Sequence, residues 1–393
     1  MIVLRRSEHL PIGVDLGHDG VKLMQLRERG QTLSVMQMRQ MAVQGMNLAT
    51  TPQERIDASI DSLAIAFKQF DFSGRHVAVT VPRHLVQHKI LRMPVMADDE
   101  LKSAIDFEAA ALFGAGPETL SIRFIPAGEV RQGNDTRLEV IVLAVATASI
   151  ESLLERYERN GLIVSSIDFE PCAIYRGVSR FVRRKEDENE VNVLVDIGCR
   201  QSQVIIGRGR AVTFYKTLDL GTASLDECVA RKLGLDVSDA TSLRRRYAEE
   251  QSTDTDPVYA AVVDATRRHL TDLAREVSLC LRYYSVTFRG QRPARVRLLG
   301  GGAGDATLRS AFASALSVPV ECYDPLAGVK MPVANAGASG AWGVAFGAAL
   351  RHAGNTLKRE QTAVAHRRSS DAPVVEVVDL NALAAPHAEV ARA

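Results

Sequence analysis

Short apolar runs that end in an Asp-x-Gly sequence occur twice in this chain, far apart. Residues 12–17 and residues 191–198 both follow this pattern. Runs of about four to eight apolar, β-branched residues that end at turn residues are typical of buried strands. A second apolar run follows each polar turn. We therefore predict two β-hairpins, each with a carboxylate, Asp15 or Asp196, near the end of its first strand.

The chemistry of such a hairpin suits a phosphate chain. Backbone N–H groups in the turn can bind an anion, and the carboxylate of Asp15 can hold a hydrated divalent cation beside it. A third strand, residues 296–299, runs directly into Gly300, Gly301 and Gly302, where the missing Cβ atoms let a flat ligand or a phosphate approach the backbone. A plain structural hairpin stays the alternative for each motif taken alone.

Helical periodicity separates these motifs. Thr51 caps and Pro52 opens a helix whose apolar positions up to Phe67 fall on one face. Further helices are predicted over residues 98–111, 150–160, 173–181, 225–233, 238–247 and 258–284.

Residues 75–162 carry a pattern of their own. Two strands, residues 76–82 and 86–91, precede a helix with acidic residues at its start. A strand at residues 138–146 precedes a helix that ends at Gly161. Acidic residues complement the helix dipole at an N-terminus, and glycine tolerates the left-handed conformation of a C-cap. We assign the segment the order β-β-α-β-β-α, in which one of the four strands has no assigned bounds.

Length and charge limit the classes of function. The chain has 393 residues, of which 46% are hydrophobic, so it is too long for one ordinary domain and can bury sizeable cores. Lys and Arg number 48 against 47 Asp and Glu, so we expect neither a nucleic-acid surface nor a polybasic membrane patch.

The 5 cysteines form no CxxC pair and indicate reduced cytosolic thiols. No apolar run reaches the roughly 18–20 residues of a membrane span, so any membrane association should pass through a partner.

Together these motifs resemble the actin-like ATPases and, within them, the PilM family of type IV pilus assembly proteins, which is related to FtsA. Residues 13–22 match the family's first phosphate loop, and residues 196–202 match its second. Residues 299–303 are similar to its adenosine element, and residues 344–351 to its closing helix. The middle segment, with its Met-Pro step and acidic helix start, resembles the small subdomain that PilM and FtsA carry and actin lacks.

The resemblance implies an α/β, actin-like two-lobed fold with duplicated ribonuclease-H-like cores and a small inserted subdomain. The expected parts are a first-lobe core at 10–74 plus 163–188, the inserted subdomain at 75–162, a second-lobe core at 189–228 plus 294–351, a helical subdomain at 229–293, and a disordered tail at 352–393. The tail lacks periodicity and is rich in Ala, Arg, Ser and His, which is typical of disorder.

The resemblance also implies a site for ATP and Mg²⁺. Asp15 and Asp196 would hold hydrated Mg²⁺, both hairpin turns would bind phosphates, and the glycine turn would lie under the adenosine. The full expected set is Asp15, Gly17, His18, Asp19, Gly20, Lys22, Asp196, Gly198, Ser202, Glu276, Gly300, Gly301 and Gly302. Glu276 would reach toward the ribose, with a surface carboxylate as the alternative. Residues 241–246 resemble the family's basic helix at the rim of the cleft.

Departures from the family weaken the case for hydrolysis. His18 and Asp19 replace the hydroxyl residues expected after Gly17, and a carboxylate there would repel a γ-phosphate unless a metal intervenes. Leu279 and Cys280 replace an Arg-Ser pair on the adenine side. No residue has the spacing of a base for a phosphoryl acceptor, which lowers the sugar-kinase alternative. We expect nucleotide binding and at most a slow ATPase, with the catalytic residues unknown.

The resemblance also implies a partner. In the family, the tail of the inner-membrane protein PilN docks on the first lobe. We therefore expect a cytoplasmic protein that docks a PilN-like tail in a nucleotide-dependent way and reaches PilO-like and other pilus components indirectly. Residues 374–383 faintly resemble that tail and could mimic it in cis or in a neighbouring chain.

Two other classes of protein stay open. An FtsA-like filament would need an amphipathic C-terminal helix, which the sequence does not display. A nucleotide-free scaffold, like the actin-like part of type II secretion proteins, is allowed by His18 and Asp19. A homo-oligomer is also allowed.

Overall fold

A computed structural model of the chain describes seven stretches, which are residues 9–18, 20–30, 32–43, 50–249, 256–288, 293–331 and 339–353. The predictions made for Asp19, for most of the tail and for its stretch 374–383 lie outside the described residues.

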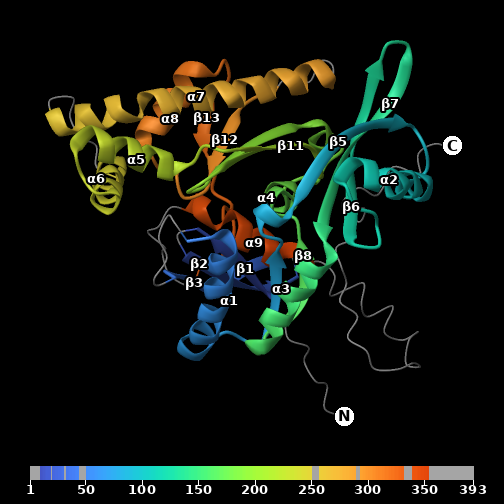
Figure 1. Cartoon of the computed structure of the whole chain (residues 1–393), viewed down its shortest axis with the longest axis horizontal. Helices are drawn as coiled ribbons and strands as arrows, with labels where there is room; N and C mark the ends of the chain where they lie inside the picture. Colours follow the sequence, from blue (N-terminus) through green and yellow to red (C-terminus); the bar gives the residue numbers. More distant parts are fainter. Residues whose placement is uncertain are drawn as a thin grey trace.

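Two five-stranded sheets form the centre of the molecule (Figure 1). The first has the order β3-β2-β1-β4-β8, with bounds Thr32–Met41, Gly20–Arg29, Ile12–Gly17, His76–Thr80 and Ile163–Asp168. The second has the order β11-β10-β9-β12-β13, with bounds Ala211–Leu218, Ser202–Arg208, Val191–Ile197, Val296–Leu299 and Val320–Cys322. In both sheets the first three strands are antiparallel, and the last two are parallel to the central one. The same strand order occurs twice, as expected for duplicated cores.

Each sheet is covered by helices that bury its apolar side chains. Helices α1 (Pro52–Gln69) and α3 (Thr147–Arg159) pack on the first sheet, where Ile60 and Leu63 are fully buried. Helices α7 (Pro257–Thr287) and α8 (Ala306–Ala315) pack on the second sheet. Helices α5 (Thr222–Leu233) and α6 (Val237–Glu249) form a smaller cluster at one end of α7 (Figure 1).

Helices α4 (Glu170–Ser179) and α9 (Gly343–Ala349) lie between the two sheets and cross closely (Figure 1). A Cβ atom on Gly347 would lie 1.7 Å from the carbonyl oxygen of Ala173, so only glycine allows this approach. Helix α4 contacts β10 and β11, whereas α9 contacts β1, β2 and β4. The prediction that assigned residues 294–351 to the second lobe is therefore corrected, because α9 packs on the sheet of the first lobe.

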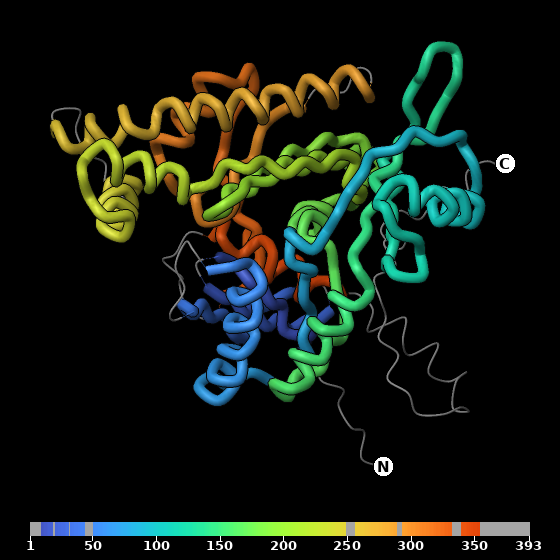
Figure 2. Tube along the Cα trace, in the orientation of Figure 1, coloured from blue at the N-terminus to red at the C-terminus, as the bar shows by residue number. Residues whose placement is uncertain are grey.

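A third sheet has the order β5-β7-β6 and is covered by α2 (Asp98–Phe113). Its strands span Gln87–Pro94, Asp135–Ala146 and Leu120–Gln132. Figure 2 shows its β6–β7 hairpin projecting away from the two large sheets. The predicted bounds 75–162 are too wide for this unit, because β4 pairs with β1 and β8 in the first sheet and α3 packs there as well. The sequence predicted β4, β5, β7, α2 and α3 as strands and helices, but it gave no bounds for β6 and β8 and did not identify which strands pair.

The remaining described elements are short helical turns, namely η1 (Arg83–Leu85), η2 (Asp187–Asn189), η3 (Ser339–Trp342) and η4 (Leu350–His352). Among the described residues, none of the helices combines the length and the apolar character that crossing a bilayer requires.

Candidate functional site

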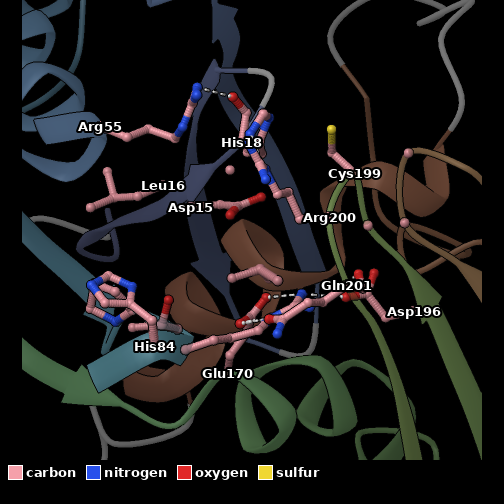
Figure 3. Close-up of a pocket in the computed structure, with 18 of the residues that line it drawn as sticks. Asp15, Leu16, His18, Arg55, His84, Glu170, Asp196, Cys199, Arg200 and Gln201 are labelled. Carbon is pink, nitrogen blue, oxygen red and sulfur yellow. Dashed lines mark hydrogen bonds and ion pairs between the residues drawn. The ribbon is translucent and has the colours of Figure 1, made fainter. Parts of the chain in front are cut away.

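A cavity of about 730 Å³ opens between the two large sheets. Three turns line it: the one after β1, with Gly17 and His18, the one after β9, with Gly198, and the one after β12, with Gly300 and Gly301. Figure 3 shows side chains from both lobes converging on this space. The three motifs singled out in the sequence therefore meet at one cavity, although they are far apart in the chain.

Asp15 and Asp196 both line the cavity, from the two different lobes (Figure 3). Asp15 pairs with Lys22 across the β1–β2 hairpin, with 3.1 Å between Lys22 Nζ and Asp15 Oδ2. Asp196 Oδ2 accepts hydrogen bonds from Gln203 Nε2 at 3.1 Å and from Arg83 Nη2 at 2.9 Å. Each carboxylate is thus bonded to a cationic side chain of the protein.

Arg83 and Glu170, which were not among the predicted site residues, complete this network. Arg83 opens η1 after β4, and Glu170 is the first residue of α4 after β8. Because β4 and β8 are parallel neighbours, their carboxyl ends meet at one edge of the sheet. Arg83 Nε and Nη2 donate to the two carboxylate oxygens of Glu170 at 2.6 and 2.8 Å. Arg83 therefore bridges Glu170 of the first lobe to Asp196 of the second.

Burial and charge act in opposite directions in this network. Burial raises the pKa of Asp196, and the nearby Glu170 and Asp15 raise it further, whereas Arg83 lowers it. Burial alone would lower the pKa of Arg83, but Glu170 and Asp196 outweigh that effect and raise it. The guanidinium therefore stays charged, and it holds two acidic groups together that would otherwise repel one another.

Two further arginines fix the turn after β1. Arg55 of α1 donates from Nη1 to the carbonyl oxygen of His18 at 3.0 Å, and Arg200 Nε lies 3.1 Å from His18 Nε2 (Figure 3). Arg200 belongs to the turn after β9, so His18 links the two hairpin turns across the cavity. Neither arginine was predicted, because both contacts join distant parts of the chain.

The predicted residues divide into two groups. Those that line the cavity are Asp15, Gly17, His18, Lys22, Asp196, Gly198, Gly300 and Gly301. Those that are described but do not line it are Gly20, Ser202, Glu276 and Gly302.

The second group has other contacts. Ser202 is fully buried and donates from Oγ to the carbonyl oxygen of Leu220 at 2.6 Å. Glu276 lies on α7 with its Oε2 3.0 Å from Lys216 Nζ, and it does not line the cavity in which the resemblance implied a ribose contact. Gly302 packs against the side chain of Ile197, which a Cβ atom would approach to 2.5 Å. Its role is one of packing.

The predicted basic helix also differs from expectation. Arg244 of α6 is buried and binds Asp226 and Asp305, and it is not among the residues that line the cavity.

The cavity fits a nucleotide in size and in its glycine turn. Ligand pockets typically have volumes of about 300–1,000 Å³, and this one falls within that range. A Cβ atom on Gly301 would meet no atom within 4 Å, although the residue lines the cavity, so a flat group can lie against the backbone there.

The predicted magnesium site does not fit this arrangement. One oxygen of each carboxylate already accepts a hydrogen bond from a cation of the protein, Asp15 Oδ2 from Lys22 and Asp196 Oδ2 from Arg83. Within the described stretches, no group of three His, Cys, Asp or Glu side chains is arranged to hold a metal ion. A hydrated Mg²⁺ at Asp196 would compete with Arg83 for this carboxylate.

Comparison with known proteins decides the family. A family model described as "Type IV pilus assembly protein PilM" matches residues 13–353. The chain belongs to the PilM family. No curated protein sequence matches it.

Solved structures share the fold of this PilM family member. A "PilM-PilN type IV pilus biogenesis complex" matches with a TM-score of 0.69 and 22% identity, over 87% of this chain and 98% of that chain. The ethanolamine utilization protein EutJ from Carboxydothermus hydrogenoformans matches with a TM-score of 0.50 and 13% identity, over 87% of this chain and 89% of that one. These likenesses confirm the predicted actin-like fold.

Proposed function

We propose that this PilM family member binds ATP in the cavity between its two large sheets and, in that state, docks the tail of a PilN-like inner-membrane protein. The protein would then work at the cytoplasmic face of the inner membrane, held there by its partner. The proposed ATP binding is supported by two hairpin turns and one open glycine turn that meet at a single cavity. The partner part is supported by the family and by the likeness to a PilM–PilN complex.

Gly301 offers a direct test of ATP binding. Leucine at this position would extend into open space in the cavity without backbone strain, because its neighbourhood is empty and its φ angle is not in the left-handed region. Gly304 is a matched control on the same turn, since it is equally open but does not line the cavity. Isothermal titration with ATP should show at least a tenfold loss of affinity for Gly301→Leu and none for Gly304→Leu. A wild-type protein that does not bind ATP would refute this part.

A second cavity offers a place for the partner's tail. It has a volume of about 210 Å³ and lies between α1 and α3, with Ile56, Leu85, Ser152 and Leu153 among its lining residues. Ile56 lines both cavities, and Leu85 belongs to the same η1 turn as Arg83. A change in the nucleotide cavity can therefore reach this groove through α1 and η1. By linkage, the tail would alter the affinity for ATP by the same factor as ATP alters the affinity for the tail.

Ser152 allows a test of this docking site. The residue is exposed on α3, so Ser152→Trp should fill the groove without a cost to the core. Glu151→Trp is the control, because Glu151 is exposed on the same helix and does not line the groove. The measurement is the fluorescence anisotropy of a labelled PilN-like tail peptide, with and without ATP. We expect ATP to strengthen binding of the peptide to the wild type. Of the two variants, only Ser152→Trp should abolish that binding. Equal losses for both variants would place the tail elsewhere.

A further inference from the structure

Arg83 lies beside Asp196, one of the two carboxylates predicted to hold a divalent cation, and bridges it to Glu170 of the other lobe. We propose that Arg83 takes the place of that cation, so that an adenine nucleotide binds in this cavity without Mg²⁺, an inference that rests on the nucleotide binding proposed above. A guanidinium is a permanent positive charge with five N–H donors in a fixed plane, which suits phosphate as well as carboxylate.

The hydrogen bonds of Arg83 leave it directed at the phosphate region. Three N–H groups donate to Glu170 and Asp196, and a fourth on Nη1 makes a long contact of 3.4 Å with the carbonyl oxygen of Gln201. The other Nη1 hydrogen has no protein partner among the described residues. Nη1 is also 3.8 Å from the place a Cβ atom of Gly198 would take, so it lies beside the second hairpin turn. A phosphate oxygen at that turn would meet a donor that is already in position.

Arg83 already binds three carboxylate oxygens that could otherwise order the waters of a hydrated metal. Mg²⁺ usually keeps several waters, which need free acceptor oxygens around them. Asp196 Oδ2 already accepts two hydrogen bonds, and both oxygens of Glu170 are bound by Arg83. Entry of Mg²⁺ would break these contacts and leave a mostly buried guanidinium without its partners.

Other positive charges line the cavity as well. Lys22, Arg55 and Arg200 lie around the turn after β1, where they would face the phosphate chain. The protein therefore supplies the phosphate region with charges of its own. Glu170, at the start of α4, is held in both oxygens by Arg83 and is not positioned to activate water, in keeping with at most a slow ATPase.

The test compares ATP affinity by isothermal titration in buffer with Mg²⁺ and in buffer with EDTA. For the wild type we expect the two dissociation constants to agree within about twofold. For Arg83→Ser we expect at least tenfold tighter binding with Mg²⁺ than with EDTA, because Glu170 and Asp196 become free to bind the hydrated metal. Arg83→Lys keeps the charge and should bind ATP more weakly than the wild type, still without a preference for Mg²⁺.

Arg92 provides the control. Its Nε also binds a buried carboxylate, that of Glu139 at 3.0 Å, but Arg92 does not line the cavity. Arg92→Ser should behave as the wild type in both buffers. Wild-type binding that needs Mg²⁺ by tenfold or more would overturn this inference alone. Absence of ATP binding in both buffers would instead overturn the proposed function. The wild-type comparison stands even if Arg83→Ser fails to fold.

Discussion

Arg83 and Arg244 each bind two carboxylates at similar distances, yet their surroundings differ. Arg244 Nε lies 2.5 Å from Asp226 Oδ1 and its Nη1 2.9 Å from Asp305 Oδ2, and all three side chains are 4 to 7% exposed. Arg83 lies 2.6 Å from Glu170 and 2.9 Å from Asp196, but its side chain is 22% exposed and lines the large cavity. The Arg244 cluster joins α5, α6 and the start of α8, whereas the Arg83 cluster joins the two lobes.

The difference shows what separates a structural ion cluster from a binding site. In both clusters the arginine keeps buried acids from repelling one another. Around Arg244 every partner belongs to the second lobe, so the cluster can only fix helices. Around Arg83 an adjoining cavity lets water or a ligand share the donors. An arginine bonded to two carboxylates therefore does not by itself indicate a binding site. A cavity beside such a cluster does.

Replacement of Arg244 should give the largest effect. Arg244→Met leaves Asp226 and Asp305 buried without their cation, and we expect a loss of about 3–5 kcal/mol in the free energy of unfolding. ATP affinity should not change. Urea denaturation measures the loss, with Arg245→Met as an exposed neighbour on the same helix that should shift stability by less than about 0.5 kcal/mol. A loss below about 1 kcal/mol would show that Arg244 is not a structural centre.

Replacement of Arg83 should reduce the free energy of unfolding less than replacement of Arg244 does, but it should weaken ATP binding more. Water in the cavity can reach Glu170 and Asp196 after Arg83→Met, so we expect a loss of only about 1–3 kcal/mol. The same urea titration, carried out without ligand, measures it. ATP binding should weaken in the absence of Mg²⁺. Equal stability losses for Arg83→Met and Arg244→Met would remove the distinction between the two clusters.

The sequence predicted the parts of this site that depend on local chemistry. The strands that carry Asp15 and Asp196 are local patterns of alternation followed by turn residues, and the glycine turn at Gly301 is local as well. All of these line the cavity as expected. The fold followed from the resemblance and was confirmed by the comparisons with solved structures.

The missed residues depend on pairing between distant strands. Arg83 and Glu170 are 87 positions apart, and they meet only because β4 and β8 are parallel neighbours. A partial signal was present, since Arg83 follows Pro82 at the end of the predicted strand 76–82. Glu170 also stands beside a proline, but no strand was predicted before it. Glu276 was predicted from resemblance alone, and on the long helix α7 a small rotation decides what a side chain contacts. Here it contacts Lys216.

The pH dependence of stability sharpens the comparison further. Burial raises the pKa of Asp196 in the folded state, so the native protein favours its protonated form. Protonation of Asp196 therefore adds to the free energy of unfolding. This contribution is fully present below the ordinary Asp pKa of about 3.9, and it is lost as pH rises through the raised pKa of Asp196 in the folded protein. Asp196→Asn is always neutral and cannot lose it. The stability of the wild type relative to Asp196→Asn should therefore fall as pH rises from about 4, in urea titrations at a series of pH values. Parallel curves, or the opposite slope, would contradict this.

The smallest effect concerns a second contact that Asp305 makes and Asp196 does not. Asp305 Oδ1 caps α8 by accepting from the backbone N–H groups of Thr307 at 2.9 Å and Leu308 at 3.3 Å, while Oδ2 binds Arg244. Both Asp305→Asn and Asp305→Ala remove the charge, but asparagine keeps a capping oxygen. We expect alanine to be less stable than asparagine by about 1 kcal/mol in urea denaturation. If the two variants are equally stable, the cap contributes nothing and Asp305 acts only as a partner of Arg244.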